Sequence, residues 1–218
     1  ITGMVKFYLM EMGERFRLYI SPTHISPRTP AVPISTPGGY SRELADKVGL
    51  FHTIGLPADT KALSNGTFSM ENYIVQSLSV FEESRRLFAF ELQRFLALKE
   101  GLLFFYFSSL DQGQHMFWAL NDKEHPFYHP EESRRFGYIT EEMYRKFDRV
   151  LGKALQAVGP DVPVLVMSDH GFGPFRREVN VNNWLAQEGY LKLTSGRAAD
   201  EVSLIEYADW PASKAYAM

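Results

Sequence analysis

The sequence predicts an α/β fold, with a mostly parallel sheet flanked by helices and a small β-hairpin before it. Two short apolar runs, "LLFFYFSSL" at 102–110 and "VPVLVM" at 162–167, read as buried strands. A strong helical pattern lies between them, so strand, helix and strand form a βαβ unit. Strands joined in this way are parallel, with a right-handed crossover.

Composition limits what the chain can be. With 45% hydrophobic and 22% charged residues in 218, it is globular, and its net charge of -3 is spread along the chain. This charge pattern indicates neither a nucleic-acid partner nor an anionic membrane surface. The absence of cysteine excludes disulfides, thiolate metal sites and a cysteine nucleophile.

The first element expected is a hairpin, because "MVKFYLM" and "FRLYI" are separated by a loop that contains Gly13. Five prolines then fall within residues 21–40, where they preclude a helix and indicate an extended connection. We therefore expect residues 1–44 to form an insert or cap element and residues 45–218 to form the core of the protein.

Two helices dominate that core. Ser69 is a suitable N-cap for a helix that runs to about Lys99. Apolar residues recur at helical spacing over 140–158, and Gly159 then ends the second helix. The tail predicts a short helix around 184–188, followed by a short strand.

Four polar residues follow the two predicted strands. Asp111 and His115 lie in the loop "LDQGQH", and Asp169 and His170 lie in "SDHG". Parallel strands end at one edge of a sheet, so these side chains should be neighbours. Two carboxylates brought together repel each other unless a cation lies between them. Oxygen and imidazole ligands suit zinc, manganese or iron, so the residues predict a metal site.

Other interpretations of these residues are less favoured. An aspartate at a strand end more often caps a turn than binds a metal, so neither loop alone predicts a site. Ser168, Asp169 and His170 do not suit a catalytic triad, because adjacent residues in an extended chain point to opposite sides. His125 and His129 are four residues apart, but their neighbouring prolines favour a loop. We assign His24 and His52 no role.

The motifs "SLDQGQH" and "MSDHGFGPF" resemble the alkaline phosphatase superfamily, and within it the type I phosphodiesterase and nucleotide pyrophosphatase group. The resemblance runs from about residue 45 onward. It implies a partial alkaline-phosphatase-like sheet and a small-molecule phosphate ester as substrate. It also implies two divalent metal ions, zinc or alternatively manganese, one held by Asp111 and His115 and the other by Asp169 and His170.

The chain also departs from the family pattern. The family has an earlier Asp ligand, a Thr or Ser nucleophile that opens a helix, and a later His, and no segment here matches them. Thr36 lies in the proline-rich segment without a preceding strand, so we reject it as the nucleophile. We expect an internal fragment of a metal-dependent phosphoric ester hydrolase, without a catalytic residue and inactive alone.

Two alternatives stay open at this point. The chain could be a non-catalytic binding or structural module that keeps the fold, or it could belong to the sulfatase or phosphoglycerate mutase branch. No apolar run reaches the roughly 20 residues of a membrane span, and the first residues do not have a signal-peptide pattern. Neither compartment nor oligomeric state follows from the sequence.

Overall fold

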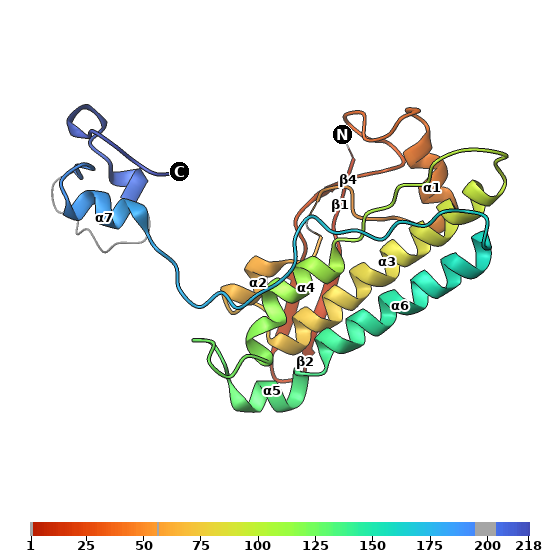
Figure 1. Cartoon of the computed structure of the whole chain (residues 1–218). Helices are drawn as coiled ribbons and strands as arrows, with labels where there is room; N and C mark the ends of the chain where they lie inside the picture. Colours follow the sequence, from red (N-terminus) through yellow and green to blue (C-terminus); the bar gives the residue numbers. More distant parts are fainter. Residues whose placement is uncertain (1, 56, 195–203) are drawn as a thin grey trace. The chain divides into compact units, whose positions relative to one another are not determined.

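A computed structural model describes residues 2–55, 57–194 and 204–218. The chain divides into two compact units, one ending at Pro174 and the other beginning at Phe175. The fold is mixed α/β, as expected, with several helices and two small antiparallel sheets (Figure 1). No helix in the described part of the chain is long and apolar enough to cross a membrane.

The predicted N-terminal hairpin is confirmed. Strands β2 (Phe7–Met12) and β3 (Phe16–Ile20) pair antiparallel. A second short ladder joins β1 (Gly3–Met4) to β4 (His24–Ile25) and brings the chain back along the start of the hairpin. The inner face of the hairpin joins the main core through buried Tyr19, which packs on Phe68.

The two long helices are also confirmed. Helix α3 (Met70–Leu96) starts with a capping box, in which Ser69 and Asn72 each accept the backbone N–H of the other. It ends three residues before the expected Lys99. Helix α6 (Ile139–Val158) stops at Gly159, whose φ of 74° suits glycine. The two helices run side by side (Figure 1).

Shorter helices complete the first unit. Helix α1 (Tyr40–Val48) contacts α3, and α2 (Thr60–Ser64) lies near the start of α3. Helix α4 (Ser109–Phe117) continues into the 3-10 turn η1 (Trp118–Leu120), and α5 (Pro130–Phe136) follows after a loop. The main core collects apolar side chains from most of these elements; its largest fully buried members are Tyr73, Phe117, Ile139 and Met143.

The predicted parallel sheet is not formed among the described residues, whose paired strands are all antiparallel. Segments 102–107 and 162–167 follow the helices without ladder hydrogen bonds. In the first, Leu102, Phe104 and Tyr106 are 90%, 76% and 66% exposed, and they alternate with half-buried residues. This alternation is typical of a strand. A strand also needs a neighbour to take its backbone hydrogen bonds, and an apolar run cannot reveal whether one is present.

The second unit is small. Helix α7 (Val181–Gln187) begins earlier than expected, because Asn180 caps it through the N–H of Asn183. The 3-10 turns η2 (Leu204–Tyr207) and η3 (Trp210–Ala212) follow. The expected short strand is reduced to an isolated bridge between Leu193 and Ala208. Buried Leu185 and Leu191 form the centre of this unit.

Candidate metal centre

Asp111 and His115 lie on helix α4, whereas the sequence predicted a loop for them. Their spacing of four residues places both side chains on one face of the helix. Gly113 lies between them, and a Cβ there would be 3.2 Å from the Phe117 ring and 3.7 Å from the Met143 methyl group. Glycine therefore leaves room for the Phe117 ring, while the opposite side of α4 carries the two polar residues.

His170 joins this pair from a segment far along the chain. Its Nε2 lies 3.4 Å from Asp111 Oδ1, and His115 Nε2 lies 3.4 Å from the same oxygen. One donor atom from each of these three residues lies within 4.8 Å of the others. The two motifs thus converge as expected, although the sheet that motivated this expectation is not formed among the described residues.

Asp169 is placed differently from its neighbour. Its side chain is 85% exposed, and its Oδ2 lies 3.9 Å from His170 Nε2, outside the three-residue group. The Asp169 carboxylate therefore lies near the His170 ring but is mostly exposed to solvent. The structure groups Asp111, His115 and His170, whereas the resemblance implied two separate pairs, Asp111 with His115 and Asp169 with His170.

The donor group fits a divalent cation. Asp111 Oδ1 is buried and accepts no hydrogen bond, although it lies between two imidazole nitrogens. A buried carboxylate oxygen without a partner is costly, and a cation would compensate it. Tetrahedral zinc with bonds of about 2.0–2.1 Å holds its ligand atoms roughly 3.3 Å apart. The two 3.4 Å separations match that spacing.

The hydrogen bonding of His170 also suits ligation. Its Nδ1 lies 2.9 Å from the carbonyl oxygen of Gly171, so Nδ1 carries the hydrogen and donates it. In the neutral imidazole, Nε2 then carries the lone pair that a metal would use, 3.4 Å from Asp111 Oδ1. The Gly171 carbonyl and the nearby carboxylates of Asp169 and Asp111 raise the pKa of His170, against a smaller opposing effect of desolvation.

Two aromatic side chains lie beside the group, and the sequence motifs did not predict them. The Phe172 ring lies 4.9 Å from the His115 ring and 5.3 Å from the His170 ring, and it stacks on Trp118 at 6.2 Å. Trp118 follows His115 by three residues, a spacing that puts it on the same side of a helix. A helical interpretation of "LDQGQH" would have found it.

Comparison with known proteins bears on this geometry. A family model described as type I phosphodiesterase / nucleotide pyrophosphatase matches residues 23–215. The chain belongs to this family. The match confirms the resemblance of the two motifs and begins earlier than the expected residue 45. The comparisons with curated proteins and with solved structures returned no significant match.

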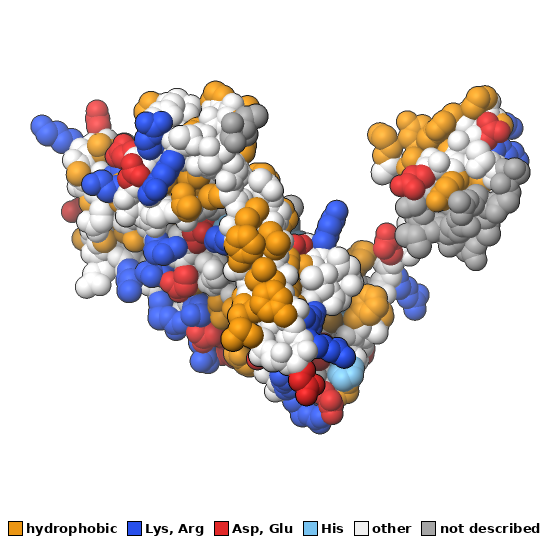
Figure 2. All heavy atoms as spheres, turned by 180° about the vertical axis from the view of Figure 1, so that it is seen from behind, with side chains coloured by type: hydrophobic (Ala, Val, Ile, Leu, Met, Phe, Trp, Pro, Cys, Tyr) orange, Lys and Arg blue, Asp and Glu red, His pale blue; other side chains and the backbone are white. Residues whose placement is uncertain are grey.

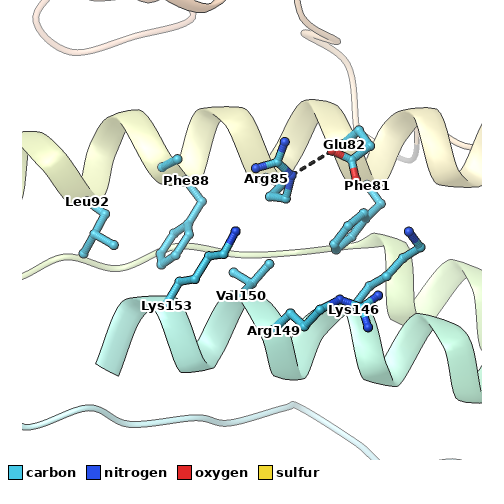
Figure 3. A pocket seen from close by; sticks show the side chains of 10 residues that line it. Phe81, Glu82, Arg85, Phe88, Leu92, Lys146, Arg149, Val150 and Lys153 are labelled. Carbon is cyan, nitrogen blue, oxygen red and sulfur yellow. Dashed lines mark hydrogen bonds and ion pairs between the residues drawn. The ribbon is translucent and has the colours of Figure 1, made fainter. Parts of the chain in front are cut away.

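A cavity of about 350 Å³ in this phosphodiesterase-family chain lies elsewhere, between α3 and α6 (Figure 3). Its floor is the helix interface around Phe81 and Val150. Lysine and arginine side chains line its edge. Both arginines form ion pairs, Arg85 with Glu82 at 2.7 Å and Arg149 with Glu142 at 3.0 Å. None of the four predicted ligands lines it. The candidate metal centre at α4 and His170 is therefore separate from this cavity.

His24 and His52, which received no role from the sequence, belong to a buried cluster around Glu83. The Glu83 carboxylate accepts from the Lys6 ammonium at 2.8 Å, and from the His52 N–H at 2.8 Å and Nδ1 at 2.7 Å. Burial raises the pKa of Glu83, but these hydrogen bonds and charges outweigh it and leave the pKa at about 2. The cluster fastens the N-terminal strands to α3.

Proposed function

We propose that this chain carries the metal-binding part of a phosphoric ester hydrolase. Membership of the type I phosphodiesterase / nucleotide pyrophosphatase family supports a phosphoester hydrolase, and it favours this branch over the sulfatase and phosphoglycerate mutase branches. The observation that carries the proposal is Asp111 Oδ1, a buried oxygen without a hydrogen-bond donor that lies 3.4 Å from two imidazole nitrogens. The substrate proposed is a small phosphate ester.

Asp111, His115 and His170 would hold one divalent cation, zinc or alternatively manganese. Asp169 would contribute to a second ion, since its carboxylate is exposed beside His170. When bound, such cations polarise phosphoryl oxygens and lower the pKa of bound water. We therefore propose that the site binds two ions.

The residues of this chain prepare the site in definite ways. Asp111 supplies negative charge, and the Gly171 carbonyl keeps the hydrogen of His170 on Nδ1. Phe172 packs against both imidazoles, and Trp118 stacks on Phe172. Segments 102–107 and 162–167 lead directly into the two motifs, so we propose them as strands of an alkaline-phosphatase-like parallel sheet. We assign no nucleophile, and we expect the chain alone to bind metal without turnover.

Metal binding is tested first. Chelator-stripped protein is titrated with zinc in competition with a chromophoric chelator. Replacing Asp111 with Asn should weaken binding by at least about 10-fold, because a neutral amide oxygen holds a cation less well than a carboxylate. Asp148→Asn, an exposed change on α6, is the control and should leave the affinity unchanged. Equal affinities for wild type and Asp111→Asn would contradict the site.

Hydrolysis is tested separately, with the longest form of the protein that its gene encodes. p-Nitrophenyl phosphate and bis-p-nitrophenyl phosphate are the substrates, with zinc or manganese added to stripped protein. Metal-dependent release of p-nitrophenol that Asp111→Asn abolishes would support the hydrolase. Zinc binding without hydrolysis of any phosphate ester would instead support the alternative, a non-catalytic module that keeps the site.

A further inference from the structure

The hairpin β2–β3 has apolar side chains on both faces. Its inner face packs on the core through Tyr8 and Tyr19. The register of the ladder puts six other side chains together on the outer face, and all six are hydrophobic and 40 to 79% exposed. These are Phe7, Leu9, Met12, Phe16, Leu18 and Ile20, which we call the outer hairpin face. A band of hydrophobic side chains marks this part of the molecule in the view from behind (Figure 2).

Three charged residues of the hairpin region are turned away from that face. Lys6, which precedes β2, reaches Glu83 on α3, and Arg17 donates to the Thr67 carbonyl at 3.2 Å. Glu11 lies opposite Arg17 in the ladder, so it shares the inner side. An antiparallel sheet with one solvated face normally carries polar residues outward. Here the outward positions are apolar, which indicates that the outer hairpin face is covered by a partner.

We propose that this partner is a second copy of the same chain, packed face to face about a two-fold axis. A face whose six ladder positions are all hydrophobic can pack on a second copy of itself, and two-fold dimers are the commonest oligomers. With aromatic side chains of roughly 150–250 Å² each, the six residues expose on the order of 600 Å² per copy, near the roughly 800 Å² per partner of standard interfaces. Homodimer interfaces are also the more apolar class.

Backbone hydrogen bonds join β2 to β3 within the hairpin, and the outer hairpin face consists of side chains. Face-to-face packing of two copies would therefore use side-chain contacts. Leu9 and Leu18 lie opposite each other near the middle of the ladder. A two-fold axis through this pair would stack two ribbons about 10 Å apart, with the leucines of both copies at the centre.

Sedimentation equilibrium over a wide concentration range tests the dimer. Leu9→Glu should raise the dissociation constant about 100-fold, because it buries a carboxylate at the centre of the interface. Met12→Glu, at the more exposed end of the hairpin, is a second variant that puts less of the fold at risk. Leu165→Glu changes an exposed leucine outside the hairpin and should leave the dimer intact. Circular dichroism confirms that each variant is folded.

Two further measurements identify the face itself. Leu9→Lys mixed with Leu9→Glu should restore association that neither shows alone. The chain has no cysteine, so Leu18→Cys should form a disulfide-linked dimer on mild oxidation, while Leu165→Cys should form far less. A wild-type chain that stays monomeric at high concentration would overturn the proposal. So would a dimer that resists Leu9→Glu and Met12→Glu but is lost in Leu165→Glu.

Discussion

At the scale of single residues, the candidate centre combines two ligands held by a helix with one ligand from an irregular segment. Asp111 and His115 are one turn apart on α4, so the helix sets their spacing. His170 comes from a segment without ladder hydrogen bonds, and its position depends on neighbouring side chains. Phe172 is the ring that contacts both imidazoles.

Replacing Phe172 with Leu tests this dependence. The leucine keeps an apolar side chain but removes the ring that packs against His115 and His170. We expect zinc affinity to fall about 10-fold, as for other changes in groups that orient metal ligands, with little change in thermal stability. Phe127→Leu, at an 83% exposed ring, is the matched control. An unchanged affinity would mean that Phe172 does not orient the imidazoles.

Glu83 has a different role, in stability. Glu83→Gln removes a buried carboxylate that pairs with Lys6 and His52, and it should lower the free energy of unfolding by about 3 kcal/mol. Glu82→Gln, at an exposed neighbouring pair, should cost no more than about 1 kcal/mol. Urea unfolding of both variants measures the difference, and equal costs would argue against the cluster.

The same carboxylate predicts a pH dependence. The pKa of Glu83 is depressed from an ordinary 4.5 to about 2 in the folded state, so the unfolded chain takes up a proton first as the pH falls. Its contribution is therefore complete above about pH 4.5 and is lost as the pH falls toward 2. Glu83→Gln should flatten the stability curve in this window, and a curve parallel to wild type would contradict the assignment.

At the scale of elements, the segment 102–107 stands out because half of it is exposed. Leu102 and Phe104 face outward, whereas Phe105 packs on Phe88 with ring centroids 5.2 Å apart. An exposed apolar strand with unpaired backbone groups is a site of aggregation. We expect this segment to dominate the self-association of partly unfolded chains.

Charged substitutions separate the two sides of this segment. Phe104→Lys should slow aggregation, measured by light scattering on heating, without lowering the melting temperature. Phe105→Lys should lower the melting temperature clearly, because it would bury a charge against Phe88 and Phe107. Equal effects of the two substitutions would show that the segment does not have distinct inner and outer sides.

At the scale of the whole molecule, the two units have separate cores. In the second, Leu191 is buried and packs with Leu185, while Asn182 binds both the N–H and the carbonyl of Ala217. Leu191→Ala should therefore cost about 2–5 kcal/mol within this unit. Hydrogen exchange should rise across α7 and stay unchanged in α3 and α6. Faster exchange in α3 would show that the units unfold together.

Much of this architecture follows from local sequence signals. Local signals predicted both long helices, because each signal acts within a few residues. These signals are the cap at Ser69, the helical spacing over 140–158 and the glycine at 159. The hairpin followed for the same reason. The pairing of segments 102–107 and 162–167 could not be settled this way, since it depends on neighbours distant in the chain.

The candidate site was predictable in part. Polar residues after apolar runs located Asp111, His115 and His170 correctly as neighbours. The exposure of Asp169 depends on the course of the backbone around it, and the ring contacts of Phe172 depend on tertiary packing. The helical state of "LDQGQH" was missed because its polar residues and glycine suggested a loop.

The position of His170 has a mechanical consequence. A cation held by His115 and His170 would join α4 to a segment beyond α6, and so act as a removable cross-link around both α5 and α6. Closing such a large loop restricts the unfolded chain more than the folded one. The concentration of free metal would then determine the stability of the segment that carries His170. The ion would contribute to folding as well as to any chemistry.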